Sequence, residues 1–338
     1  MARNNGFFRL IVFSWARPQI PVKILLVTLR RQAVIDVGTN SVKLLVAEIG
    51  SSGVRPVIER SEQTRLGRGF YETHVLLSDA ITQTARAVAA FARTAQEHGA
   101  SPVRVLATSA ARDAVNRASL LEAIERASEV KVEIISGEQE AELVFRGVAT
   151  DPQLDGRRLL ILDVGGGSTE FIVGAGKHHQ FSESFDIGTV RLLERLRPAD
   201  PPSKEDLANC RARLKEFFAK EVRPVMEPCL ADRANLTLVG TGGTTTILAR
   251  MEKQMSGFQR EEIEGTVLSR TRIGHWMEKL WSLSVAQRRE IAGVPGGRAD
   301  IVPMGAAIYE AVMDQFGFGE VFVSTRGLRF GALMPQNE

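Results

Sequence analysis

The chain has 338 residues, in which 43 Lys and Arg residues nearly balance 40 Asp and Glu residues. Six of the basic residues and no acidic residue fall within residues 1–32, so the remainder is slightly acidic and does not indicate a nucleic-acid partner. The length exceeds what one hydrophobic core usually serves, which favours two domains.

Residues 1–32 contain short apolar runs but no membrane span. The run from Phe7 to Ala16 is interrupted by Arg9, whereas a transmembrane helix needs about 20 predominantly apolar residues. No convincing small-residue cleavage site follows, so a signal peptide is not indicated. We therefore expect a poorly ordered N-terminal extension, no membrane partner, and a fold that begins near Ala33.

The first folded stretch, Ala33 to Gly50 (AVIDVGTNSVKLLVAEIG), predicts a strand, a Gly-containing turn and a second strand. Leu159 to Gly176 (LLILDVGGGSTEFIVGAG) repeats this pattern at an offset of 127 residues. A duplicated strand–turn–strand unit predicts two related α/β domains that face each other across a cleft. The aligned pairs are Asp36 with Asp163, Gly38 with Gly165, and Ser41 with Ser168.

Strands and helices alternate between these two hairpins, which indicates βαβ units and a partly parallel sheet. The expected helices and strands are placed by the spacing of apolar residues, by residues that favour a helix N-cap, and by glycines that end a helix. We expect strands at Val54–Arg60, Val103–Ala107 and Val130–Ile135, and helices from the N-cap Ser78 to His98 and from Gly137 onward.

The second half continues the alternation and adds a third Gly-containing turn. The sequence TGGTTT after a short strand would place a helix N-terminus, with its free N–H groups, beside an anion; its residues are Gly242, Gly243 and Thr244. Cys210 and Cys229 are the only cysteines and lie in helix-like sequence, which is typical of free thiols in a reducing, cytoplasmic compartment. The expected elements are strands His179–Phe185, Leu236–Gly240 and Val321–Ser324, a helix opened by Asp186–Thr189, and a long helix Lys204–Met226.

The Gly-rich turns predict a phosphate site, because glycine lets backbone N–H groups approach an anion closely. Asp163 and Glu170 flank the second turn, and carboxylates beside bound phosphate indicate a cation such as Mg²⁺ between them. Asp36, at the matching position of the first turn, is a further candidate for contact with that metal. The expected phosphate-binding residues of the two turns are Gly38, Thr39, Asn40 and Ser41, and Gly165, Gly166, Gly167, Ser168 and Thr169.

Nine segments in order resemble the exopolyphosphatase and guanosine pentaphosphate phosphatase (Ppx/GppA) family, in its short two-domain form, within the actin-like, sugar-kinase and Hsp70 superfamily. The resemblance implies two RNase H-like domains, at residues 33–150 and 151–324, with the site in the cleft between them and residues 325–338 packed back on the first. Gln139 and Phe330 depart from the family pattern, since each stands where an acidic residue is usual. The segments are DVGTNSVKLLV, TRLGRG, TSAARDAVN, ISGEQEAEL, LDVGGGSTE, DIGTVRL, VGTGGTTT, RADIVPMGA and STRGLRFG.

The resemblance assigns the catalytic carboxylate to Glu140, which would act as general base toward the attacking water. The guanidinium group of Arg112 can bind a phosphate through two parallel hydrogen bonds, so Arg112 is a further phosphate-binding candidate. By position alone, the interpretation of Glu140 as a solvated helix residue is favoured, and only the resemblance outweighs it. Arg112 could pair with Asp113 or Glu138, and Glu170 could be an edge-strand charge. Adjacent side chains on a strand point to opposite faces, so His178 and His179 are not expected to form a metal pair.

Four functions are compatible with this pattern. The first is release of terminal phosphate from inorganic polyphosphate, and the second is removal of the 5′-γ-phosphate of guanosine pentaphosphate at the same site. The third, from another class, is ATP binding of the sugar-kinase or actin-like type; a weakly active phosphate-sensing scaffold is a further alternative. A homodimer is compatible with all of them. Because a polymer carries about one charge per phosphate, basic side chains should line the cleft; the candidates are Arg65, Arg68, Arg191, Arg195 and Arg298.

Overall fold

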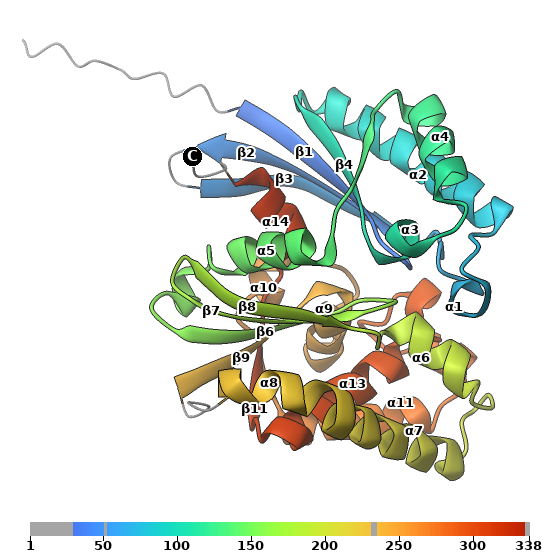
Figure 1. Ribbon diagram of the computed structural model, residues 1–338, viewed down its shortest axis with the longest axis vertical. Helices are drawn as coiled ribbons and strands as arrows, with labels where there is room; N and C mark the ends of the chain where they lie inside the picture. Colours follow the sequence, from blue (N-terminus) through green and yellow to red (C-terminus); the bar gives the residue numbers. More distant parts are fainter. Residues whose placement is uncertain (1–29, 51–52, 231–234, 335–338) are drawn as a thin grey trace, which may run out of the picture.

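The computed structural model describes residues 30–50, 53–230 and 235–334, and it contains two mixed β-sheets with helices packed around them (Figure 1). In the first sheet three antiparallel strands are followed by two that run parallel to β1. The order is β3-β2-β1-β4-β5, with β1 Arg30–Val37, β2 Val42–Gly50, β3 Gly53–Glu62, β4 Val103–Ala107 and β5 Val132–Ile134.

The second sheet repeats this arrangement. Its strands β8-β7-β6-β9-β11 correspond to β3-β2-β1-β4-β5, with the same antiparallel and parallel pairings, and β10 is added at one edge. The predicted duplication of an α/β unit is therefore confirmed at the level of strand order. The strands are β6 Arg158–Val164, β7 Thr169–Ala175, β8 His178–Phe185, β9 Leu236–Thr241, β10 Val267–Ser269 and β11 Glu320–Val323.

Helices cover both sheets (Figure 1). Those of the first half are α1 Phe70–Thr73, α2 Ser78–Glu97, α3 Ser109–Asp113, α4 Arg117–Ser128 and α5 Gly137–Val148. The second half contributes α6 Thr189–Leu196, α7 Lys204–Phe217, α8 Arg223–Leu230, α9 Gly242–Glu252, α10 Arg260–Ile263, α11 Arg270–Trp281, α12 Val285–Arg289, α13 Val302–Phe316 and α14 Leu328–Leu333. Within these described ranges, no helix combines the length and apolarity that crossing a bilayer requires.

β1 is buried on both faces, which explains its nearly continuous apolar sequence. Successive side chains of a strand point to opposite faces. Ile35 accordingly packs into a core shared with α2, whereas Val34 packs into a second core shared with α5, α14 and the strands of the second sheet. This second core joins the two halves of the protein.

α14 lies against α5, β1 and β2, next to the first sheet although it ends the described chain (Figure 1). The two helices approach closely because glycines stand at their contact. A Cβ on Gly331 would overlap the carbonyl oxygen of Leu143, and a Cβ on Gly147 would overlap that of Gly327. The close approach of α5 and α14 thus depends on the absence of side chains at these positions.

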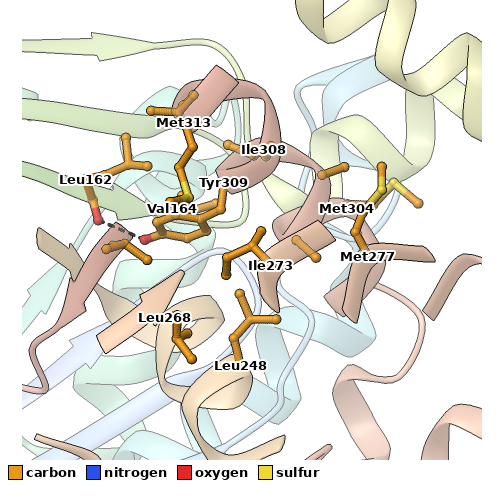
Figure 2. Close-up of a cluster of buried hydrophobic side chains, with 14 of the residues drawn as sticks. Leu162, Val164, Leu248, Leu268, Ile273, Met277, Met304, Ile308, Tyr309 and Met313 are labelled. Atoms are coloured by element: carbon orange, nitrogen blue, oxygen red, sulfur yellow. Dashed lines mark hydrogen bonds between the residues drawn. The ribbon is translucent and has the colours of Figure 1, made fainter. Parts of the chain in front are cut away.

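The largest core lies around α13 in the second half (Figure 2). Tyr309 of α13 is fully buried, and its hydroxyl donates a hydrogen bond of 3.0 Å to the carbonyl oxygen of Leu162 in β6. Leu248 of α9 packs into the same core. β6 and α9 carry two of the Gly-rich turns at their ends, so this core fixes the positions of those turns.

Several predicted boundaries shift in the structure. β1 begins at Arg30, three residues before the predicted start at Ala33, and residues 1–29 lie outside the described residues. Leu77, not Ser78, is the N-cap of α2, because the Leu77 backbone is extended and its carbonyl accepts the N–H of Ile81. The predicted long helix Lys204–Met226 continues through a π-helical turn to Leu230.

Candidate active site

The two duplicated turns line one cavity of about 370 Å³. Each turn closes with the same hydrogen bond: the N–H of Gly38 donates to the carbonyl of Ser41 at 3.1 Å, and that of Gly165 donates to Ser168 at 3.0 Å. The two turns that line the cavity are therefore closed by the same backbone hydrogen bond. A Cβ on Gly167 would collide with the Tyr71 hydroxyl, so the second turn also needs glycine to fit against the first half.

The third turn, at the start of α9, reaches the same cavity. Gly242 adopts a left-handed backbone with φ of 83°, and a Cβ there would overlap the carboxylate of Asp163. Glycine is thus required for this turn to approach Asp163. Three buried polar atoms around the cavity have no hydrogen-bond partner among the described residues: the Asn40 side-chain amide nitrogen, the Thr241 hydroxyl and Arg250 Nε. They offer two N–H donors and a hydroxyl to a bound molecule.

Asp163 and Glu170 face each other across β6 and β7 and line the cavity. The hydroxyls of Ser168 and Ser184 each donate a hydrogen bond to Glu170 Oε1, at 2.6 and 2.9 Å. These two bonds orient the carboxylate. Burial raises the pKa of Asp163 to about 6, with Lys43 opposing the shift and Asp36 adding to it. Burial also raises the pKa of Glu170 to about 7, and the charge of Asp163 adds to that shift.

Glu140 lies in the first turn of α5, and its side chain is 12% exposed on the cavity wall. It is therefore not a solvated surface residue. Burial raises the pKa of Glu140 well above its ordinary value; Glu170 adds to the shift and Arg112 opposes it. Gln139, the departure from the family pattern, completes a capping box with Ser136 by accepting its backbone N–H at 2.9 Å.

Arg112 contacts Glu140 rather than the cavity. Its Nη1 donates to Glu140 Oε2 and to the carbonyl oxygen of Ile135, both at 3.1 Å, and the residue is not part of the cavity wall. This geometry makes Arg112 a positioning residue for the Glu140 carboxylate. Its role as a phosphate clamp stays a prediction that the observed contacts do not favour.

The cavity contains cations that sequence reasoning missed. Lys43 pairs in register with Asp36, its Nζ 3.9 Å from the carboxylate, and burial lowers the pKa of Lys43. The offset of 127 residues places Lys43 on Glu170, so the duplicated alignment contained this signal. Arg329 and Arg250 also line the cavity.

Of the five arginines predicted to line the cleft, Arg298 does so; its Nη2 donates to the Ser41 hydroxyl at 2.6 Å. Burial lowers the pKa of Arg298 to about 10. The other four lie elsewhere, and for them the prediction was wrong. Arg65 pairs with Asp300, Arg68 pairs with Asp79, Arg191 pairs with Asp186 and donates to the Gly167 carbonyl, and Arg195 is exposed.

The predicted metal ligands Asp36, Asp163 and Glu170 all line the cavity. Throughout the described part of the chain, no three His, Cys, Asp or Glu side chains are grouped closely enough to hold an ion together. Asp163 and Glu170 nevertheless line one cavity, where Glu170 is buried and Asp163 is partly exposed. They fit a hard cation that keeps water and substrate oxygens as its other ligands. His178 is exposed and His179 pairs with Glu142 at 3.1 Å, in agreement with their exclusion as a metal pair.

Known proteins resemble this chain over most of its length. The sequence model described as the Ppx/GppA phosphatase family matches residues 45–337. Exopolyphosphatase 2 of Mycobacterium tuberculosis is 34% identical over 295 residues, covering 83% of this chain and 89% of its own. A bifunctional 3-dehydroquinate synthase/phosphatase of Fusobacterium nucleatum is 26% identical over 311 residues, covering 90% of this chain and 46% of its own.

Solved structures give the same result. A Cytophaga hutchinsonii exopolyphosphatase superposes with a TM-score of 0.81 at 29% identity, covering 90% of this chain and 96% of that one. An Aquifex aeolicus member of the Ppx/GppA family superposes with a TM-score of 0.74 at 30% identity, with the same two coverages. These similarities confirm the predicted pair of RNase H-like domains of the actin-like superfamily.

Proposed function

Since the chain belongs to the Ppx/GppA phosphatase family, as a hydrolase of phosphoanhydride bonds, we propose that its substrate is inorganic polyphosphate, from which it releases terminal phosphate. The observation that supports this most is the grouping of Glu140, Asp163 and Glu170 with all three Gly-rich turns on one cavity. Anion-binding backbone and buried carboxylates are both needed to hydrolyse a polyanion. Membership of this phosphatase family also argues against the sugar-kinase alternative.

The terminal phosphate would lie between the two duplicated turns, where backbone N–H groups, the Asn40 amide and Arg298 can donate to its oxygens. Arg298 is fixed before substrate binds, since it is already bonded to Ser41. Fixed donors stabilise charge that develops in the transition state without reorganisation. The turns thus hold and polarise the group that is attacked.

Glu140 would accept the proton of the attacking water. Its raised pKa brings it closer to neutral pH than an exposed glutamate, which makes it a stronger base when ionised. Arg112, itself held by the Ile135 carbonyl, donates to Glu140 Oε2, so Glu140 Oε1 is the atom left to orient the water. The in-line geometry needs this orientation as much as basicity.

Asp163 and Glu170 would hold a Mg²⁺ ion by their carboxylate oxygens, with substrate and water completing its shell. Such an ion would neutralise charge on the phosphate oxygens and polarise the bond that breaks. The Ser168 and Ser184 hydroxyls keep Glu170 oriented for this task. Without a cation, two buried carboxylates in contact with a polyanion would repel it.

A second candidate substrate is guanosine pentaphosphate. The cavity wall also includes Phe258, which is 42% exposed, and the guanidinium carbon of Arg260 lies 5.7 Å from the centroid of its ring. An exposed aromatic ring beside a guanidinium group can stack on a nucleobase. The same catalytic residues would then serve a nucleotide.

The test is phosphate release measured in parallel on long-chain polyphosphate, guanosine pentaphosphate and ATP, each with and without Mg²⁺. We expect the highest kcat/KM on long-chain polyphosphate with Mg²⁺. Preference for guanosine pentaphosphate that is lost in Phe258→Ala would move the assignment to the second candidate. Release from none of the three by protein whose fold is verified by circular dichroism would disprove both.

A further inference from the structure

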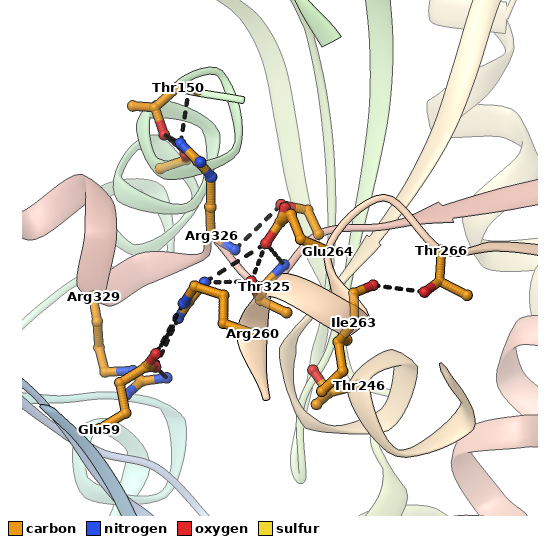
Figure 3. Close-up of polar contacts among 12 residues, drawn as sticks. Glu59, Thr150, Thr246, Arg260, Ile263, Glu264, Thr266, Thr325, Arg326 and Arg329 are labelled. Carbon is orange, nitrogen blue, oxygen red and sulfur yellow. Dashed lines mark hydrogen bonds and ion pairs between the residues drawn. The ribbon is translucent and has the colours of Figure 1, made fainter. Parts of the chain in front are cut away.

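The cavity has a second end, away from the catalytic turns, where one carboxylate lies between two guanidinium groups. Glu59 of β3 is on the wall there, with Arg329, Phe330 and the exposed Arg60. Arg260 of α10 contacts Glu59 with two nitrogens, Nε to Oε1 at 2.9 Å and Nη2 to Oε2 at 2.7 Å (Figure 3). Arg329 Nη2 lies 3.4 Å from the same Oε2 atom.

The two arginines are held in place without Glu59. Arg260 stacks on the Phe330 ring, with its guanidinium carbon 4.4 Å from the centroid, and also donates to the Thr325 hydroxyl. Arg329 Nη1 donates to the carbonyl of Leu44 at 2.8 Å. Their side chains are only 10% and 18% exposed. A preformed site for an anion with two oxygens therefore exists at this end of the cavity.

Glu59 itself is held by these two arginines. It stands on β3, the edge strand of the first sheet, and its side chain is 13% exposed. Among the described residues, its carboxylate bonds only to Arg260 and Arg329. An anion that binds both guanidinium groups more strongly can therefore replace it.

Charges continue from this end to the catalytic turns. Arg329 and Lys43 line the same cavity, and Lys43 Nζ lies 3.9 Å from the Asp36 carboxylate beside the first turn. Cations on this path are therefore available to a chain molecule that spans from the turns to Arg260. A single terminal phosphate at the turns would not reach Arg260, because its partner Glu59 stands two residues along β3 from Ser61, the register partner of Lys43.

We propose that Glu59 takes the place of a distal phosphate group of the substrate, so that only a polyphosphate long enough to reach Arg260 and Arg329 displaces it. This inference rests on the proposed function. Displacement exchanges one anion for another of equal or higher charge on the same two guanidinium groups. Long chains gain this contact and short chains do not, so Glu59 and its two arginines determine the preference for chain length.

The test compares Glu59→Gln with the parent protein on tripolyphosphate and on long-chain polyphosphate. Gln keeps the size of the side chain but no longer competes as an anion. We expect the ratio of KM for tripolyphosphate to KM for long-chain polyphosphate to rise about tenfold, the effect of one charge-assisted hydrogen bond. Arg260→Gln should change the same ratio in the opposite direction. It also keeps the test decisive if Glu59→Gln fails to fold.

Glu62→Gln is the matched control, since Glu62 is exposed on the same strand and is not part of the cavity wall. It removes the same charge and should leave the ratio unchanged. An equal effect of Glu62→Gln and Glu59→Gln, or an unchanged ratio in both Glu59→Gln and Arg260→Gln, would overturn the inference. If the parent protein itself releases no phosphate from either polymer, the proposed function fails instead, so the two failures are distinguishable.

Discussion

At the residue scale, the site depends on carboxylates that differ in what surrounds them. Glu140 contacts an arginine, whereas Glu170 accepts hydrogen bonds from two serine hydroxyls. The first arrangement leaves a charged base with one oxygen free, and the second orients an oxygen toward a cation. Similar side chains thus acquire different tasks from their neighbours.

We expect Glu140→Gln to keep the fold and reduce kcat by roughly 10²- to 10⁴-fold, the usual cost of removing a general base. KM for polyphosphate should change little, because the amide keeps the size of the carboxylate. Initial rates and circular dichroism check this. Glu138→Gln is the control, since Glu138 is exposed in the same helical turn. Near-parent turnover in Glu140→Gln would refute the assignment of the base.

The carboxylates of Asp163 and Glu170 predict a pH-dependent stability. Their folded pKa values of about 6 and about 7 lie above their ordinary values of 3.8 and 4.5. The folded state therefore binds these protons more tightly, and the stability they contribute is full at low pH and is lost as pH rises from about 4 to about 7. The thermal midpoint should fall over this window and should fall less in Asp163→Asn or Glu170→Gln.

Mg²⁺ should counteract this loss where the carboxylates are ionised. We expect the ion to raise the thermal midpoint more at about pH 8 than at about pH 5. The shift should shrink in Asp163→Asn and Glu170→Gln, together with the Mg²⁺ dependence of the rate. Scanning fluorimetry across a Mg²⁺ titration measures it. Titrations of both variants that overlay the parent curve would place the metal elsewhere.

At the element scale, local patterns predicted most of the secondary structure. The strand Val103–Ala107 and the helix starting at Gly137 were predicted to the residue, because period-two apolar runs and a Ser cap are local signals. The π-helical turn at Phe218–Val222 was not predicted. The apolar residues of this turn continue the spacing of those in α7, and that spacing does not distinguish a π-helical turn from an α-helical one.

The contact between α5 and α14 can be tested at its glycines. We expect Gly331→Ala to destabilise the protein by about 1–3 kcal/mol, the usual cost of overpacking, because the new methyl group meets the backbone carbonyl of Leu143. Urea unfolding of the variant measures this cost. Gly296→Ala is the control, since a Cβ there meets no atom within 4 Å. Equal stability of the two variants would show that the helices adjust freely.

At the scale of the whole molecule, sequence reasoning was weakest where contacts join distant residues. The duplicated turns and Glu140 were predicted from short motifs. Arg298 was predicted to line the cleft, but its partner Ser41 is 257 residues away, and the pair Glu59–Arg260 spans 201 residues. No spacing in the sequence encodes such pairs. The domain boundaries near residues 150 and 324 stay a prediction.

The start of the fold gives a test on the whole chain. Arg31 of β1 bonds to the Glu48 carboxylate at 3.0 and 3.1 Å, and its carbonyl accepts the N–H of Ser101 at 2.8 Å. We expect a chain starting at Arg30 to keep parent activity and thermal midpoint. A chain starting at Ala33 should melt several degrees lower, because it loses these bonds. If both chains melt together, the extra residues of β1 contribute nothing to stability.

The two matching hairpins carry opposite charges at one aligned position, where Lys43 stands in the first copy and Glu170 in the second. A cleft between two identical walls would have twofold symmetry, and both walls would act equally on a bound polyanion. Opposite charges at this position remove that symmetry. The lysine of one wall attracts the oxygens of a bound phosphate, whereas an ionised carboxylate on the other wall repels them.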